Sequence, residues 1–133
     1  LVCGDRRWGA WDSNDRRYTE ERDVEKTYRL VASLPLGSVV IEGEARGADQ
    51  LARYAAEDLG YAVESYPANW NLYGLRAGPV RNAEMLERGR PDVVVYCHWN
   101  LADSKGTRDM VRRAMEARVP TLSVDEWLGS IDA

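Results

Sequence analysis

Short apolar runs alternate along this chain with longer segments in which apolar residues recur every three or four positions. The short runs predict five strands, one at the start of the chain and four over residues 38–42, 62–65, 93–97 and 121–124. The longer segments predict four helices, one beginning at Thr19 and stopped by Pro35 and Gly37, and three over residues 48–59, 79–88 and 107–118. Residues 67–78 are irregular and aromatic, and this loop is long enough to be functional.

Strands and helices that alternate in this way predict an α/β fold, a Rossmann-like three-layer sandwich with a five-stranded, mostly parallel sheet. Right-handed crossovers place helices on both faces of such a sheet, and the expected strand order is 3-2-1-4-5. In that order the first and fourth strands flank a crevice at the carboxyl edge of the sheet. The 133 residues are enough for one domain with a real core, spanning residues 1–133.

Glycine-bearing loops occur at three points that this topology brings together: Gly4-Asp5-Arg6, Gly43 to Gly47, and Gly106-Thr107-Arg108. Glycine lets the backbone approach a ligand closely, and the N–H groups and dipole at a helix start favour an anion. The spacing differs from the dinucleotide fingerprint G-x-G-x-x-G, so a standard NAD site is not predicted. Glycines at such turns serve backbone geometry alone at least as often. We expect the three loops to converge on one phosphate pocket.

The charge balance changes this picture in one respect. The chain has 18 basic and 22 acidic side chains, a formal net charge of -4, which does not support broad attraction to nucleic acid. An acidic body with arginines gathered near the proposed edge suits a small anionic ligand better than DNA. The alternative, that they are solvated surface residues, would explain about half of these arginines. They are Arg6, Arg7, Arg46, Arg76, Arg81 and Arg108.

Several residues near the loops have two interpretations. Thr107 and Asp49 each either cap a helix or bind the ligand. Asp5 either orients a ribose hydroxyl or closes a turn. Arg81 lies just inside the predicted third helix, where its charge opposes the dipole, so a ligand or a carboxylate is expected beside it. The tryptophans offer a stacking surface for a base, although packing under loops is expected for at least two of Trp8, Trp70 and Trp99.

The remaining composition predicts no metal site and no membrane segment. Cys3 and Cys97 each lie near the end of an apolar strand and are expected to be reduced core thiols, and His98 is expected to be a hydrogen-bonded strand-end histidine. One histidine and two cysteines do not make a metal-ligand pattern. No apolar run approaches a membrane span and no signal segment opens the chain, so we expect a cytoplasmic protein. Leu1 follows the pattern of a strand already under way, so a few native residues are expected before it.

The sequence resembles the SLOG superfamily, named for the DNA-processing protein DprA (also called Smf) and the plant lonely-guy phosphoribohydrolases, and is most similar to its YspA/YpsA-related branch of bacteria and phages. The resemblance covers nearly the whole chain in order. The matching segments are Val2-Cys3-Gly4-Asp5-Arg6 with Trp8, Gly43-x-Ala45-Arg46-Gly47-Ala48-Asp49 with Leu51-Ala52, Pro67-Ala68-x-Trp70 with Tyr73-Gly74, Ala77-Gly78-Pro79-Val80-Arg81-Asn82 with Met85, and Gly106-Thr107-Arg108-Asp109-Met110.

The resemblance implies a Rossmann-like fold that binds or senses nucleotides or nucleotide-derived molecules, frequently as a homodimer, with no cofactor of its own. The hydrolases of the superfamily carry P-G-G-x-G-T-x-x-E and a second motif R-K-x-x-M with a catalytic arginine. Arg81-Asn82-Ala83-Glu84-Met85 is similar to the second motif, but Met110 stands where the first motif has its glutamate. The candidate ligand-binding residues are Gly4, Asp5, Arg6, Gly43, Arg46, Gly47, Asp49, Trp70, Arg81, Asn82, Gly106, Thr107 and Arg108.

Two classes of function follow from these observations. The first is a binding or sensing module for a phosphate-bearing nucleoside, such as a nucleotide or an ADP-ribose derivative. The second is an enzyme that cleaves an N-glycosidic bond in such a compound, with Arg81 and Glu84 as its expected catalytic pair. The other carboxylate candidates for that reaction are Asp5, Glu44 and Asp109. DNA binding in the manner of DprA is a distant third class.

Overall fold

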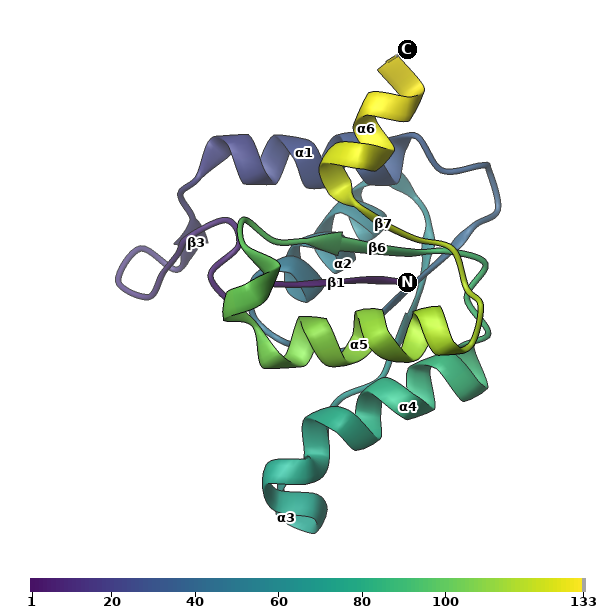
Figure 1. The fold of residues 1–133 in the computed structure, drawn as a ribbon. Helices are drawn as coiled ribbons and strands as arrows, with labels where there is room; N and C mark the ends of the chain where they lie inside the picture. Colours follow the sequence, from purple (N-terminus) through teal and green to yellow (C-terminus); the bar gives the residue numbers. More distant parts are fainter. Residues whose placement is uncertain (133) are drawn as a thin grey trace.

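The computed structural model describes residues 1–132, which form an α/β fold with parallel sheets and helices on both sides of them (Figure 1). One sheet contains β1 (Val2–Gly4), β6 (Val94–Cys97) and β7 (Thr121–Ser123), in the order β1-β6-β7. The second contains β4 (Val39–Glu42) and β5 (Ala62–Ser65). Both sheets are parallel throughout. The predicted α/β class with parallel strands is therefore confirmed.

The predicted order 3-2-1-4-5 corresponds to β5-β4-β1-β6-β7. Three of its four neighbour relations are present as ladders, and β1 lies against β4. Within the described residues no ladder joins β1 to β4, so the continuity of the five-stranded sheet stays a prediction.

Alternating residues of the strands supply two apolar cores, one on each face. Val2, Val40 and Val95 point to the same side and pack with the helices α1 (Glu21–Ala32), α2 (Ala48–Leu59) and α6 (Val124–Asp132). Cys3, Ile41 and Val94 point to the other side, toward α4 (Ala77–Gly89) and α5 (Lys105–Glu116). Side chains of a strand alternate between its faces, so this division gives the three layers of the predicted sandwich.

Several element boundaries differ from the predicted ones. The capping residue of α1 is Glu20 rather than Thr19, whose hydroxyl instead donates to the Ala10 carbonyl. Helix α4 begins two residues before Pro79. Helix α5 begins at Lys105, because the Ser104 side chain accepts the backbone N–H of Thr107 and so caps the helix. The predicted second helix has the bounds of α2, and Gly60 ends it in the left-handed conformation.

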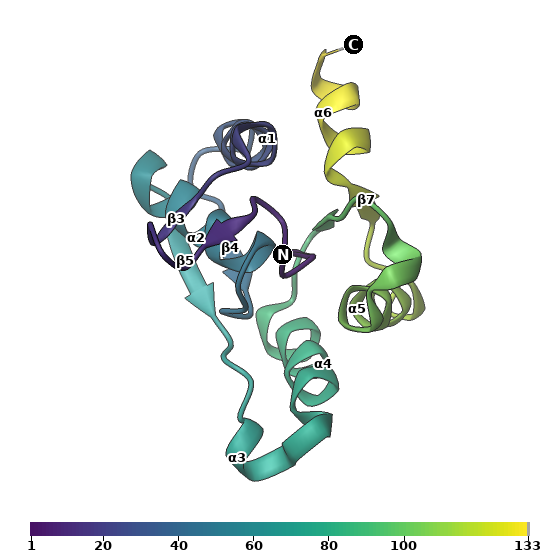
Figure 2. The same cartoon turned by 90° about the vertical axis from the view of Figure 1, so that its left-hand side faces the viewer.

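The loops contain short elements that the sequence pattern did not predict. Residues before α1 form a hairpin of β2 (Trp11–Asp12) and β3 (Arg17–Tyr18). Residues between β5 and α4 contain α3 (Trp70–Tyr73) and the 3₁₀ helix Gly74–Arg76, and another 3₁₀ helix, Leu101–Asp103, precedes α5. Figure 2 shows α3 at the far end of α4, away from the strands. None of the described helices has the length and apolar character needed to cross a bilayer.

Candidate ligand cleft

A cleft of about 550 Å³ opens where β1 ends and α5 begins. We refer to it as the carboxyl-edge cleft. Four segments line it: the turn after β1, the start of α2, the first half of α4 and the first turn of α5. Its buried apolar lining residues are Cys3, Met85 and Met110, and its polar lining includes Asp5, Arg6, Asp49, Arg81, Asn82, Lys105, Gly106 and Thr107.

A second hollow of about 540 Å³ adjoins the carboxyl-edge cleft and shares Arg6, Ala45 and Arg81 with it. We refer to it as the aromatic hollow, because the half-exposed ring of Trp70 lines it. The Arg6 guanidinium carbon lies 5.8 Å from the centre of that ring, which is a cation–π contact. Arg46 lines this hollow as well, so the expected loops around Gly4, Gly43 and Gly106 do converge on one composite depression.

Arg81 connects the two hollows. Its Nη1 donates to the Gly43 carbonyl over 2.5 Å and its Nε donates to Asn82 Oδ1 over 3.1 Å. A Cβ added at Gly43 would lie 2.3 Å from the same guanidinium, so glycine is needed there to admit Arg81. Because α4 begins at Ala77, Arg81 lies beyond its first turn, and its guanidinium bonds to the Gly43 carbonyl rather than to the expected ligand or carboxylate, with the charge of Asp49 nearby.

The backbone N–H groups of residues 43–47 are mostly occupied, contrary to the prediction that they are free to bind phosphate. Gly43 and Ala45 donate to Asp49 Oδ2 over 3.1 and 3.3 Å, and Glu44 donates to Glu42 Oε2 over 2.5 Å. Gly47 donates to the Tyr18 hydroxyl over 3.0 Å. Two buried carboxylates thus hold this loop from within, and the charged side chain that the loop presents to the aromatic hollow beside Glu44 is that of Arg46.

Gly47 and Gly4 are explained by packing. Gly47 has φ +79°, and a Cβ there would lie 2.2 Å from the Asp5 carbonyl oxygen, which also accepts the Ala48 N–H over 3.2 Å. A Cβ at Gly4 would lie 2.1 Å from the Cys97 carbonyl oxygen. Gly47 does not line the carboxyl-edge cleft. These glycines let the β1 turn, the start of α2 and the end of β6 approach one another.

The first turn of α5 lines the cleft, as a phosphate pocket at this edge of the sheet requires. Lys105 and Gly106 line it, and a Cβ at Gly106 would meet nothing within 4 Å. Among the described residues, neither N–H of this pair has a hydrogen-bond acceptor, whereas the next N–H, that of Thr107, is taken by Ser104. The Thr107 hydroxyl, which is buried, pairs with the Ser104 hydroxyl over 3.0 Å. The two free N–H groups and the helix dipole favour an anion here.

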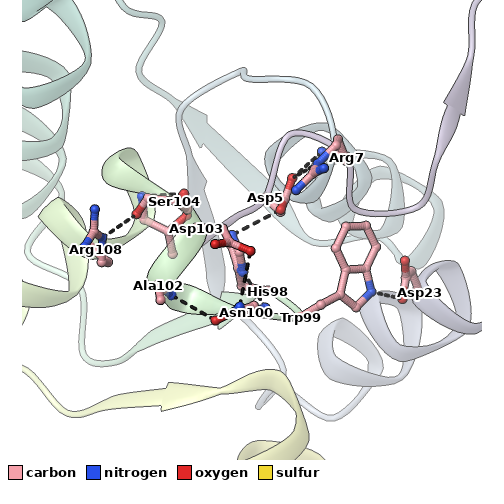
Figure 3. A network of polar contacts seen from close by, with 11 residues as sticks. Asp5, Arg7, Asp23, His98, Trp99, Asn100, Ala102, Asp103, Ser104 and Arg108 are labelled. Atoms are coloured by element: carbon pink, nitrogen blue, oxygen red, sulfur yellow. Dashed lines mark hydrogen bonds and ion pairs between the residues drawn. The ribbon is translucent and has the colours of Figure 1, made fainter.

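Asp5 closes a turn, the second of the two interpretations given to it. Its Oδ1 accepts the Arg7 N–H over 2.6 Å and its Oδ2 lies 3.1 Å from His98 Nε2 (Figure 3). The other ring nitrogen of His98 accepts the Asn100 N–H over 2.9 Å, so the proton of a neutral ring lies on Nε2, directed at Asp5. His98 is a hydrogen-bonded strand-end residue, as predicted, and it holds the turn that presents Arg6 and Arg7.

Asp49 is the most perturbed carboxyl group of the cleft. Its side chain is 5% exposed and lines the cleft, beside Cys3 and Arg81. Burial raises the pKa of Asp49 to about 7, against the lowering effects of Arg81 and of the Ala45 and Gly43 N–H groups. Asp49 does not cap α2, because the capping position is Gly47. A carboxyl that titrates near neutrality in a cleft is typical of a functional group.

The structure does not bring all the predicted site residues into the cleft. Glu84, expected beside Arg81, pairs with Arg88 over 3.2 Å and lines a separate depression on α4. Asp109 is occupied by Asn82, Arg112 and Arg113, and although burial raises its pKa, the hydrogen bonds from Asn82 and Arg113 bring it below its ordinary value.

Two further candidates lie outside the cleft. Arg108 donates from Nε to the Ser104 carbonyl and does not line the cleft. Glu44 faces Arg53 at 3.5 Å. Asn82 does line the cleft, but its amide group is engaged with Gly106, Arg81 and Asp109, so it joins α4 to α5. Lys105 lines the cleft but was not among the predicted site residues, although it lies beside Gly106 in a predicted loop.

The tryptophans divide as the sequence suggested. Trp8 is 1% exposed and donates to Thr27, so it is a core residue. Trp99 packs on it with ring centroids 5.5 Å apart and donates to Asp23 (Figure 3). Trp70 alone lines the aromatic hollow. Cys3 and Cys97 are free, buried thiols, and burial raises the pKa of Cys3 to about 12, which keeps it neutral. No group of metal-ligating side chains occurs in residues 1–132.

The raised pKa of Asp49 predicts a pH-dependent difference between the wild type and Asp49→Asn. Between about pH 4 and pH 7 the folded wild type holds a proton on Asp49 that the unfolded chain has lost, so its free energy of unfolding falls as pH rises. Urea unfolding of both proteins should show the wild type losing about 2 kcal/mol relative to the variant between about pH 5.5 and pH 8. A constant difference over that range would contradict a carboxyl that titrates near 7.

The chain is similar over 128 residues to the Gene 61 protein of Mycobacterium phage D29, with 32% identity. The similarity covers 92% of this chain and 93% of the phage protein. No family model matches the chain, and no solved structure matches it.

Proposed function

The chain belongs to the family of this phage Gene 61 protein, and we propose that it binds a phosphate-bearing nucleoside, such as a nucleotide or an ADP-ribose derivative, in the carboxyl-edge cleft. The observation that carries the proposal is the pair of free N–H groups of Lys105 and Gly106, at the start of a twelve-residue helix and open to that cleft. We also propose that the chain is a member of the SLOG superfamily with the five-stranded sheet order. The sequence resemblance to that superfamily supports the same class of ligand.

The charges around the cleft suit a phosphate group. Arg6, Arg81 and Lys105 line it, and Arg6 lies between the cleft and the aromatic hollow. Of the carboxylates that line the cleft, Asp5 is engaged by His98 at 3.1 Å and lies 3.5 Å from the Arg7 guanidinium, whereas Asp49 and Asp103 belong to other parts of the lining. A volume of about 550 Å³ lies within the range of small-molecule sites. The phosphate is placed at the α5 start, and the base is placed against Trp70 in the aromatic hollow.

Calorimetry with a panel of mono- and dinucleotides tests this proposal. The Arg46 side chain is exposed and lines the aromatic hollow. Arg46→Glu should weaken the binding of those nucleotides that bind by about 1.5–3 kcal/mol, the scale of a charge-assisted hydrogen bond. Arg16→Glu, in the β2–β3 turn, is the matched control, because Arg16 lines neither hollow, and it should bind as the wild type does. Equal affinities for the wild type and the Arg46 variant would remove the aromatic hollow from the site.

The hydrolase alternative has lost its expected carboxylate. Glycosidic cleavage needs a carboxylate to stabilise the charge that develops on the ribose. Met110 occupies the position of the hydrolase glutamate, Glu84 lies outside the cleft and Asp109 is held by two arginines. We therefore expect binding without turnover. DNA binding also has little support, because the net charge is -4.

The alternative has a direct test. Incubation of the purified protein with AMP and related monophosphates, followed by chromatography, should release no free base above the rate of a protein-free control. Multiple turnovers would move the protein to the enzyme class. If Glu84→Gln then abolished them, Arg81 and Glu84 would be the catalytic pair, whereas retained turnover in that variant would exclude Glu84.

A further inference from the structure

Asp49 presents one unused carboxylate oxygen to the carboxyl-edge cleft. Its Oδ2 accepts the N–H groups of Gly43 and Ala45, whereas Oδ1 has no hydrogen-bond partner among the described residues. No buried side-chain oxygen of residues 1–132 lacks a partner, so Oδ1 is open to solvent. Asp49 as a whole is nevertheless only 5% exposed. Because it lines the cleft, the accessible Oδ1 faces the cleft.

The surroundings of Asp49 make this oxygen an acceptor. The neighbouring lining residues Cys3, Met85 and Met110 offer no strong hydrogen-bond donor, since the Cys3 thiol is only a weak one. Arg81 is near enough to favour the ionised form, but makes no ion pair with Asp49 within the described residues. Oδ1 is accessible from the cleft, so a ligand that fills the cleft and excludes water from this oxygen must supply a donor, because the oxygen would otherwise become buried and unpaired.

Above about pH 7, where Asp49 is ionised, a phosphate is repelled from Oδ1, because it carries the same sign of charge as the carboxylate. The anion-binding feature of the cleft is the α5 start, formed by a different segment of the chain. A nucleotide carries its sugar hydroxyls between the phosphate and the base. With the phosphate at Lys105 and Gly106 and the base against Trp70, the sugar is the part left beside Asp49, and its hydroxyls are donors.

We infer that Asp49 Oδ1 accepts a hydrogen bond from a sugar hydroxyl of the ligand, so that the site selects ribonucleoside phosphates over their deoxy counterparts. This inference rests on the proposed function and adds its substrate class. It also assigns the ribose contact to Asp49 instead of Asp5, both of whose carboxylate oxygens are already engaged. A site built to bond a hydroxyl discriminates strongly against an analogue that lacks it, because the acceptor is then left unpaired.

Calorimetry with AMP, its 2′-deoxy and 3′-deoxy analogues and inorganic phosphate tests the inference at about pH 8, where Asp49 is ionised. The wild type should bind AMP at least about tenfold more tightly than one of the deoxy analogues. Asp49→Asn keeps an oxygen for the Gly43 and Ala45 N–H groups and should reduce that preference to less than about threefold. Asp103→Asn, which changes an exposed carboxylate of the same cleft, should keep it.

The outcomes separate the two proposals. Equal wild-type affinities for AMP and both analogues, or an Asp49→Asn variant that keeps the full preference, would overturn the sugar contact and leave nucleotide binding intact. Equal weakening of all three nucleotides in Asp49→Asn would also overturn it, by pointing to the base or the phosphate. No binding of any nucleotide by the folded wild type would overturn the proposed function as well. The wild-type comparison alone decides the matter if the variant does not fold.

Discussion

Gly47→Ala is expected to lower the free energy of unfolding by about 3 kcal/mol, a large effect for one methyl group. The added Cβ would lie 2.2 Å from the Asp5 carbonyl oxygen and 2.6 Å from the Arg6 carbonyl carbon. Both are backbone atoms, so the β1 turn would have to move away from α2. The conformation of Gly47, with φ +79° and ψ -122°, adds a second penalty for any residue with a side chain.

Gly37→Ala is the matched control for this prediction. Gly37 also has a positive φ, +86°, but a Cβ there would meet nothing within 4 Å. Its substitution should cost about 1 kcal/mol from the backbone conformation alone. Urea unfolding of the two variants separates the effects. If Gly47→Ala were no more destabilising than Gly37→Ala, the close approach of the two backbones that shapes the cleft would be contradicted.

Arg81→Met is expected to weaken nucleotide binding by at least about tenfold, because it removes one of the two cations, Arg6 and Arg81, that line both hollows. Methionine keeps much of the apolar stem, so the packing of α4 is largely retained. The lost hydrogen bond to the Gly43 carbonyl should also lower stability by about 1 kcal/mol.

Arg88→Met provides the control for Arg81. Arg88 lies on the same helix, but its side chain is exposed and pairs with Glu84 outside the cleft. This variant should bind as the wild type does in the same calorimetric titrations. Unchanged binding in Arg81→Met would show that Arg81 does not contact the ligand where the two hollows meet.

The hydrophobic periodicity predicted the strands and helices that form the core, since burial of one face leaves a direct trace in the sequence. It did not predict α6 or the β2–β3 hairpin. Helix α6 follows β7 without a loop, so its apolar residues read as a continuation of the strand. The hairpin strands have two residues each, too few for an alternating pattern to show.

The location of the site was predictable, whereas the use of its hydrogen bonds was not. Glycine loops at strand ends indicated the carboxyl edge, but the same residues are required whether N–H groups face a ligand or a carboxylate. Which one occurs depends on the rotamer of Asp49, whose Oδ2 reaches back to Gly43 and Ala45. Glu84 likewise has two arginines at helical spacing, Arg81 and Arg88, and it pairs with Arg88 on the next turn.

Three expectations remain predictions after the structure. The continuous order β5-β4-β1-β6-β7 lacks the ladder between β4 and β1. The homodimer implied by the family resemblance concerns a second chain, and the cytoplasmic location concerns the cell. None of the three enters the argument for the cleft, which depends on residues within one chain.

A titration followed by proton–nitrogen correlation NMR is the most direct test of nucleotide binding in the carboxyl-edge cleft. On addition of AMP or ADP-ribose, the largest amide shifts should occur at Lys105, Gly106 and Arg6, which surround the proposed phosphate position. Amides at the opposite end of the strands, such as those of Leu34 and Val93, should not move. An absence of shifts with either nucleotide, or shifts that avoid the start of α5, would contradict the account.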